Sequence, residues 1–265
     1  MKYVLVTGAC GGMGRSTVTA LRKAGYGVFA LDVTECGAED GVIPIAADVT
    51  DEKAVLRAAE KVGEVTDELF AIVHFAGVYA LDSFAEIPFE NLRRIFDINM
   101  FGAMLVNKTF LPFVKKGGRI IMTTSELAPL DPLPFTGIYA VTKAALDKYA
   151  YSLAMELQLL GISVSVIRAG AVQTGMLGAS SSALDRFCAS TALYPCNAKR
   201  FKKVVDNVEA KCVPPRKIAD KAVKILGRKK TKFAYSVNRN PFLLMLNALP
   251  AGLQMRIIKG ILKNE

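Results

Sequence analysis

Tyr139 and Lys143 lie four residues apart in the stretch YAVTK, a spacing that puts both side chains on one face of a helix. An unperturbed tyrosine has a pKa of about 10, too high for efficient proton transfer at neutral pH. A nearby cation favours the phenolate and lowers that pKa. The pair therefore predicts a proton-transfer site in which Lys143 lowers the pKa of Tyr139.

Two other polar residues are candidates for the same chemistry. Ser125 ends the apolar run GRIIMTTS, and ligands of open α/β sheets bind at the carboxyl ends of strands. A hydroxyl there can donate to a substrate carbonyl oxygen. Thr124 competes for this role, because alternation along the strand does not settle which side chain points inward. Asn99 is an unusual choice for a helix interior, although a polar residue facing solvent would explain it equally.

A glycine-rich turn, TGACGGMG from Thr7 to Gly14, stands between a strand-like and a helix-like segment. Glycines let the backbone approach a pyrophosphate, and the following helix offers free N–H groups. Asp32 follows about twenty residues later, where a carboxylate binds ribose hydroxyls and repels a 2′-phosphate. We therefore expect NAD(H) to be favoured over NADP(H), although Arg15 beside the turn argues the other way. Asp48 either accepts from the adenine amino group or caps the next helix.

These residues need a sheet that brings them to one edge. Short apolar runs alternate with longer helical patterns, which is typical of parallel βαβ units. The expected strands cover residues 3–8, 26–33, 42–50, 69–77, 118–126, 163–170 and 232–237, and helices are expected after the glycine turn and over 51–62, 88–114 and 139–160. The fold class is α/β. We predict one doubly wound Rossmann domain over residues 1–265, with a seven-stranded, mostly parallel sheet and helices on both faces.

Two regions interrupt this alternation. Residues 175–215 form a long stretch with a cluster of small residues, and loops of that length are uncommon unless they are functional. We interpret it as a lid over the substrate. Residues 238–265 place Arg256, Lys259 and Lys263 among apolar residues at helical spacing. This tail could contact a membrane surface, cap an apolar pocket or pack in the core.

Composition narrows the class of protein. The chain is 52% hydrophobic and 22% charged, which is typical of a globular domain, and no apolar run is long enough to cross a bilayer. We expect a cytosolic protein. Five scattered cysteines and the single histidine, His74, argue against a disulfide framework and a metal site, and Cys10 is interpreted as a small spacer.

The positive charge is concentrated near the C-terminus. Residues 199–265 contain 17 basic and 4 acidic side chains. Such a region could face nucleic acid, an anionic membrane or an acidic substrate, or consist of solvated helix faces. Nucleic-acid binding is not expected, because neither interleaved aromatic residues nor a known motif accompanies the charge.

Taken together, these motifs resemble the short-chain dehydrogenase/reductase family over nearly the whole chain. Thr7, Gly8, Gly12 and Gly14 match its TGxxxGxG turn, and RAGAVQT at 168–174 is similar to its nicotinamide-binding segment. The four catalytic positions fall in order on Asn99, Ser125, Tyr139 and Lys143. The resemblance implies dinucleotide contacts from Gly8, Gly12, Met13, Gly14, Asp32, Asp48, Val49, Ala76, Gly77, Tyr139, Lys143, Val172 and Thr174.

The resemblance also implies roles for the four catalytic positions. Tyr139 exchanges the proton, Ser125 steadies the carbonyl, and Asn99 keeps a water in the proton path. Lys143 holds the nicotinamide ribose while lowering the Tyr139 pKa. The family's Asn-Asn-Ala-Gly reads His-Phe-Ala-Gly at 74–77 and its Pro-Gly reads Ala-Gly at 169–170. We expect altered packing at the sheet ends, lost hydrogen bonds at His74, and a structural rather than catalytic histidine.

The substrate region looks like the hydroxysteroid and retinol dehydrogenase branch, which implies an apolar secondary alcohol or ketone such as a steroid-like lipid. The alternatives are a 3-oxoacyl reductase acting on an acidic acyl substrate, and a regulatory protein that binds NAD without turnover. The family usually pairs through its long helices, so we expect a homo-oligomer.

Overall fold

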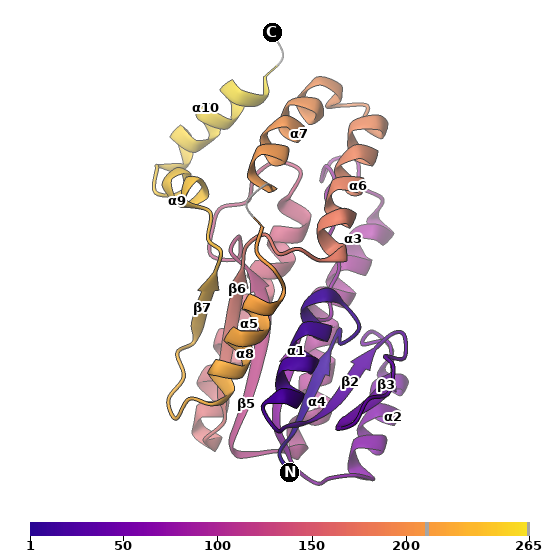
Figure 1. Ribbon diagram of the computed structural model, residues 1–265. Coiled ribbons are helices and arrows are strands. Elements are labelled where there is room, and N and C mark those ends of the chain that lie inside the picture. Colours follow the sequence, from indigo (N-terminus) through magenta and orange to yellow (C-terminus); the bar gives the residue numbers. More distant parts are fainter. Residues whose placement is uncertain (210–211, 264–265) are drawn as a thin grey trace.

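A seven-stranded sheet forms the centre of the protein in the computed structural model, which describes residues 1–209 and 212–263. The strand order is β3-β2-β1-β4-β5-β6-β7 (Figure 1). Every neighbouring pair is parallel, so the expected fold is confirmed and the sheet is parallel throughout. The strands are β1 (Tyr3–Thr7), β2 (Gly27–Asp32), β3 (Val42–Ala46), β4 (Leu69–His74), β5 (Val114–Ser125), β6 (Ser163–Ala169) and β7 (Ala234–Val237).

Helices cover both faces of the sheet (Figure 1). One apolar core lies between the sheet and α1 (Gly12–Lys23) and α8 (Arg216–Leu226). The core on the other face involves α2 (Glu52–Gly63), α4 (Gly102–Phe110) and α5 (Gly137–Leu157). Because both faces are buried, the central strands are almost continuously apolar, and this explains why their sequences do not alternate.

Strands β1 and β4 are neighbours near the middle of the sheet. The direction in which successive strands are added to the sheet reverses between them. Chains leaving these two strands go to opposite faces, and ligands of open α/β sheets bind in the crevice this creates. The glycine turn follows β1, and residues 75–77 follow β4. The topology therefore brings both segments to the same crevice.

The expected helical region 88–114 is confirmed but is not uniform. It consists of α3 (Phe89–Phe96), a π-helical turn η1 (Asp97–Phe101), α4, and a 3-10 turn η2 (Leu111–Phe113). Asn99 lies within the π turn and is fully buried. Such turns often occur at functional sites, and the interpretation of Asn99 as a solvent-facing residue is wrong.

Residues 175–215 are mostly helical rather than a loop. They form the antiparallel pair α6 (Gly175–Ser190) and α7 (Pro195–Glu209), which rises beyond the carboxyl edge of the sheet (Figure 1). The pair encloses an apolar cluster that includes Leu184, Phe187 and Phe201. Residues 210–211 of the expected lid lie outside the described residues.

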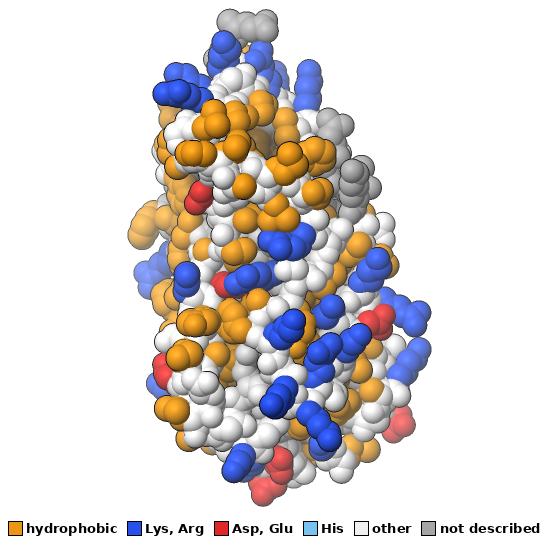
Figure 2. Space-filling model, turned by 90° about the vertical axis from the view of Figure 1, so that its left-hand side faces the viewer, with side chains coloured by type: hydrophobic (Ala, Val, Ile, Leu, Met, Phe, Trp, Pro, Cys, Tyr) orange, Lys and Arg blue, Asp and Glu red, His pale blue; other side chains and the backbone are white. Residues whose placement is uncertain are grey.

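The tail begins near the end of β7 and forms α9 (Pro241–Asn247) and α10 (Ala251–Leu262). Helix α10 packs on α7, where Asn197 donates to the carbonyl of Leu262. Apolar side chains gather at this end of the molecule with Lys and Arg around them (Figure 2). Residues 264–265 of the tail lie outside the described residues. Among the residues that are described, no helix is long and apolar enough to cross a membrane.

Candidate active site

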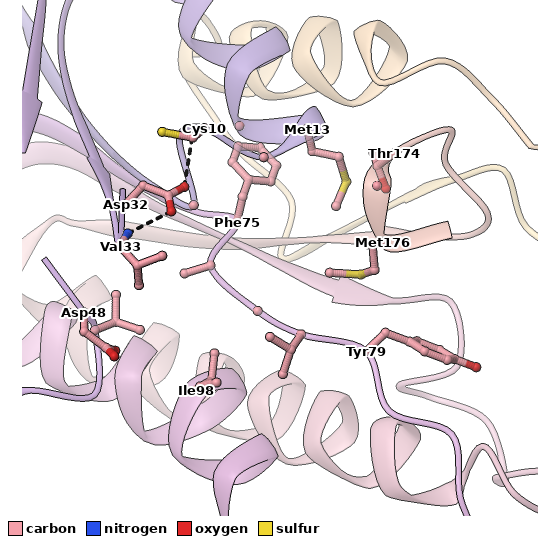
Figure 3. A pocket seen from close by; sticks show the side chains of 18 of the residues that line it. Cys10, Met13, Asp32, Val33, Asp48, Phe75, Tyr79, Ile98, Thr174 and Met176 are labelled. Carbon is pink, nitrogen blue, oxygen red and sulfur yellow. Dashed lines mark hydrogen bonds between the residues drawn. The ribbon is translucent and has the colours of Figure 1, made fainter. Parts of the chain in front are cut away.

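A pocket of about 800 Å³ opens at the carboxyl ends of β1, β2 and β4. Asp32 and Cys10 lie at one end, and Tyr79, Thr174 and Met176 lie toward the other (Figure 3). Its expected lining residues are Gly8, Gly12, Met13, Gly14, Asp32, Asp48, Val49, Ala76, Gly77 and Thr174. These expected residues come from five segments of the chain, which the fold joins in one cavity.

Glycines are required at two positions of this wall. Gly8 has a φ of +65°, and a Cβ on it would lie 2.5 Å from the amide nitrogen of Ala76. A Cβ on Gly14 would lie 2.0 Å from the carbonyl oxygen of Gly8. The first turn of α1, all of which is described, contains no acidic side chain. A bare backbone and a helix N-terminus fit the pyrophosphate of a dinucleotide.

The Asp32 carboxylate is held by two backbone donors at the end of β2 (Figure 3). The amide of Cys10 donates to Oδ2 over 2.9 Å, and the amide of Val33 donates to Oδ1 over 2.8 Å. Each oxygen keeps a lone pair for a ribose hydroxyl. Arg15, the basic residue nearest the glycine turn in sequence, is exposed and is not part of the pocket wall.

Asp48 also lines the pocket, with its Oδ1 bound to the amide and hydroxyl of Thr50. The cap of α2 is Asp51, which accepts from the amide of Lys53, so the alternative role of Asp48 as a helix cap is wrong. Val172 is buried and paired with Val213 in a β-bridge, and it is not part of the pocket wall.

Sequence reasoning did not identify several wall residues. They are Cys10, Gly11, Val33, Ala47, Thr50, Phe75, Val78, Tyr79, Arg94, Asp97, Ile98, Gly175 and Met176. Most are chain neighbours of expected residues. Arg94 and Ile98 are four residues apart in a helical segment, so their spacing could have indicated a common face.

The structure distinguishes Ser125 from Thr124. Thr124 donates to Asp147, which also forms a two-pronged ion pair with Arg168. The Ser125 side chain instead interacts with the Tyr139 phenol, whose pKa it lowers, and its Oγ accepts from the amide of Leu127. Thr124 therefore fastens β5 to α5 and β6, whereas Ser125 faces the candidate proton-transfer residue.

Tyr139 is near the start of α5, with its ring 4.9 Å from the ring of Tyr79. Burial raises the pKa of the Tyr139 phenol above its ordinary value, Tyr79 raises it further, and the hydrogen bond with Ser125 lowers it. The expectation that Lys143 lowers this pKa is wrong for this structure. Lys143 is not among the groups that shift this pKa, and its ammonium lies 5.7 Å from the ring centre.

Lys143 and Asn99 meet beside Gly77. Lys143 is buried, donates to the carbonyl of Thr123 over 3.2 Å, and has its pKa lowered to about 8 by burial. Asn99 accepts a hydrogen bond from the amide of Val78 through Oδ1, and its Nδ2 donates to the Val78 carbonyl and the Thr142 hydroxyl. A Cβ on Gly77 would lie 3.1 Å from Asn99 Oδ1 and 3.4 Å from Lys143 Nζ. Both side chains therefore lie near Gly77, a residue of the pocket wall, but none of the four expected catalytic residues, Asn99, Ser125, Tyr139 and Lys143, lines the pocket itself.

His74 is structural, as expected, but its hydrogen bonds are not lost. Its Nε2 donates to Asn107 Oδ1 over 2.8 Å, and Thr7 Oγ1 donates to its Nδ1 over 3.5 Å. Asn107 in turn donates to Tyr149. The chain of contacts links β1 and β4 to α4 and α5, so the substituted histidine takes over the tie across the central sheet.

We expect His74→Asn to reduce the loss of stability on acidification. Burial lowers the pKa of His74 from 6.5 to about 4, so the unfolded chain takes up a proton that the folded chain does not. Stability therefore falls as the pH drops from 6.5 towards 4. Urea unfolding at about pH 7 and about pH 4.5 should show that the unsubstituted protein loses about 2 kcal/mol more than the variant. Equal losses would contradict this account. His74 is the only histidine of the chain, so no other histidine contributes to the difference.

One disulfide is present, although the scattered cysteines argue against a disulfide framework. Cys10 and Cys36 form a disulfide, whereas Cys188, Cys196 and Cys212 are free. Cys10 is therefore more than a spacer. The two cysteines and Asp32 also form a group close enough to hold a metal ion, but sulfurs joined in a disulfide are not thiolate ligands. Their spacing, 26 residues apart without a CxxC motif, carried no local signal.

Comparisons with known proteins agree with this geometry. A family described as short chain dehydrogenase matches residues 2–185, a range that includes every expected site residue. Estradiol 17-beta-dehydrogenase 2 of Mus musculus is 35% identical over 189 residues, covering 67% of this chain and 50% of that protein. The match thus spans about half the length of that relative.

Two further proteins are similar over most of the chain. The 3-ketodihydrosphingosine reductase of Bacteroides thetaiotaomicron is 24% identical over 237 residues, covering 89% of this chain and 87% of that protein. The crystal structure of a short-chain dehydrogenase from Streptomyces avermitilis covers 98% of this chain and 97% of its own, with a TM-score of 0.78 and 23% identity. At this level of identity, the similarity to the Streptomyces avermitilis structure shows that the two chains share a fold.

Proposed function

This chain belongs to the short-chain dehydrogenase/reductase family, and from this premise we propose that it interconverts a secondary alcohol and a ketone with NAD(H). The observation that carries the proposal is the grouping of Ser125, Tyr139 and Lys143 at the carboxyl edge of the sheet. Dinucleotide binding without turnover would not need a phenol, a hydroxyl and an ammonium together. The regulatory alternative is therefore disfavoured.

Each side chain has a distinct part in the proposed reaction. The nicotinamide, when bound, supplies or accepts the hydride. Tyr139 exchanges the proton with the substrate oxygen; its phenol is protonated at neutral pH, which is the form that can donate to a ketone. The Ser125 hydroxyl accepts a hydrogen bond from the Leu127 amide, so it can donate its own hydrogen bond to the same substrate oxygen.

Lys143 and Asn99 support this pair. The Lys143 ammonium lies near Gly77, a residue of the pocket wall, and we propose that it holds the nicotinamide ribose there. Asn99 is a positioning residue, because its side chain clamps the backbone of Val78 in the pocket wall. The water expected near Asn99 stays a prediction.

The preference for NAD(H) rests on Asp32. Its carboxylate is fixed at the end of the pocket and would repel the 2′-phosphate that distinguishes NADP(H). Asp32→Ala should therefore weaken NADH binding about tenfold and NADPH binding much less. Fluorescence titration of both nucleotides measures the ratio, with the exposed Glu35→Ala as a control. Equal losses for both would remove the argument for selectivity.

An apolar, steroid-like lipid is the proposed substrate class. Tyr79 contacts Tyr139 and packs against the apolar cluster of α6 and α7, so an apolar surface adjoins the proposed proton-transfer residue. The names of the two curated relatives, a steroid dehydrogenase and a sphingosine reductase, support the same class. In this proposal residues 175–215 act as the lid.

The test is an absorbance screen at the nicotinamide band. NAD(H) and NADP(H) are offered with panels of steroids, retinoids and acyl ketones, in both reaction directions. Turnover of an apolar alcohol or ketone with NAD(H) supports the proposal. Tight NADH binding with no turnover of any panel member would favour the regulatory alternative, and exclusive use of acyl ketones would favour the oxoacyl reductase.

The tail adds a proposal about location. We place the protein in the cytosol as a homo-oligomer, with membrane contact through α9 and α10. Phe242, Met245 and Met255 are exposed there, and the basic residues Arg256 and Lys259 follow Met255 closely in the sequence. At low salt, the protein should sediment together with vesicles that are rich in anionic lipid. Equal recovery from neutral vesicles would contradict a role for the basic residues.

A further inference from the structure

The disulfide between Cys10 and Cys36 joins two walls of the dinucleotide pocket. Cys10 belongs to the glycine turn after β1, and Cys36 belongs to the segment that follows β2, with their Cα atoms 5.4 Å apart. Both cysteines are half-buried, whereas Glu35 and Gly37 on either side of Cys36 are exposed. We infer that a small thiol in solution approaches the bond from the side of Cys36.

The bond is next to the carboxylate that the proposed function assigns to the ribose. A sulfur of each cysteine and a carboxylate oxygen of Asp32 all lie within 4.8 Å of one another. The Cys10 amide is also one of the two donors that orient Asp32 (Figure 3). Any movement of Cys10 therefore changes both the glycine turn and the orientation of the ribose-binding group.

The segment after β2 has another anchor at its far end. The side chain of Arg22 forms an ion pair with Glu39 and donates to the carbonyl of Asp40. The disulfide fixes the part of the segment closer to the pocket, where Val33 and Thr34 are exposed. Breaking it would free this part and the glycine turn from each other, and binding would then have to order both.

We propose that Cys10 and Cys36 are a reversible dithiol–disulfide pair that sets the affinity for the dinucleotide, with the oxidised form binding more tightly. The inference rests on the proposed function, because it takes the pocket as a dinucleotide site. Disulfides in the cytosol, where we place this protein, are mostly transient and redox-sensing.

The exchange partner is a small-molecule thiol–disulfide couple such as glutathione. A thiolate attacks the Cys36 sulfur, the bond to Cys10 breaks, and a mixed disulfide forms. A second thiolate then attacks the small-molecule sulfur of that mixed disulfide. The net step transfers two electrons and two protons from two thiols to the cysteines, and yields two protein thiols and one small-molecule disulfide.

The experiment measures NADH binding by fluorescence titration after equilibration with oxidised or reduced glutathione, with thiols counted by mass spectrometry. We expect the dissociation constant to rise about fivefold on reduction. Cys36→Ser should show the weaker affinity under both conditions, because its bond is absent. Cys196→Ser, which removes an exposed free cysteine, should respond as the unsubstituted protein does.

A second measurement needs no variant. Binding that favours the oxidised form must, by reciprocity, make the bond harder to reduce by the same factor. Saturating NADH should therefore lower the midpoint potential of the pair by about 20 mV for a fivefold effect. NADH binding that is equal in both redox forms, with an unchanged potential, would overturn this inference alone. If neither the oxidised nor the reduced form bound NADH, both the proposed function and the inference would be overturned.

Discussion

Tyr139→Phe is expected to lower kcat about a thousandfold or more while leaving the NADH dissociation constant within about twofold. The change removes the hydroxyl that we propose exchanges the proton and that interacts with Ser125. It keeps the aromatic ring that packs 4.9 Å from Tyr79, so the pocket wall should remain in place. Single-turnover rates with the best substrate from the screen, together with NADH titration, measure the two effects separately.

Tyr151→Phe is the matched control, because Tyr151 is on the same helix but its side chain is largely exposed. It should retain the full rate. A Tyr139→Phe enzyme with near-normal turnover would show that another group transfers the proton. Loss of NADH binding in that variant would instead indicate that the hydroxyl supports the pocket rather than the chemistry.

Gly14→Ala is expected to weaken NADH binding at least tenfold. The added Cβ would lie 2.0 Å from the carbonyl oxygen of Gly8 and 2.8 Å from the Cα of Ala9. Both contacts are with backbone, so no flexible side chain can move aside and the glycine turn must shift away from the start of α1. The pyrophosphate would then meet a displaced set of amide groups.

Gly252→Ala provides the comparison for this substitution. Gly252 is in α10, and nothing lies within 4 Å of its added Cβ, so NADH binding should be unchanged. Circular dichroism and thermal unfolding separate a local shift from a loss of fold. A folded Gly14→Ala protein with unchanged NADH affinity would mean that the dinucleotide does not bind against this turn.

Local pattern was enough to predict most of the fold. The seven apolar runs are strands, and the helical region after Pro88 continues to Phe113. The π turn at Asn99 was not predictable, because a local widening of a helix depends on what the residue contacts rather than on the spacing of apolar residues. Residues 175–215 were interpreted as a lid loop because their small residues obscure the helical period, yet two helices form around an apolar cluster.

The candidate site shows the same division. The glycine turn, Asp32 and the Tyr139–Lys143 pair could be identified from residue type and spacing, and the topology brings the first two together in one pocket. The direction of the Tyr139 pKa could not, because burial of the phenol and the neighbouring Tyr79 raise it, and these depend on the folded surroundings. Val172 was expected in the pocket, but it pairs with Val213 and is buried.

The amino-acid sequence by itself determined the order of strands and helices, the glycine turn after the first strand, and the Tyr139–Lys143 spacing. These properties depend on residues within a few positions of one another, through backbone conformation and the periodicity of apolar side chains. Only the tertiary structure decided the partners of Ser125 and His74 and the pairing of Cys10 with Cys36. Such contacts join residues far apart along the chain, and no local pattern records which of them the folded sheet brings together.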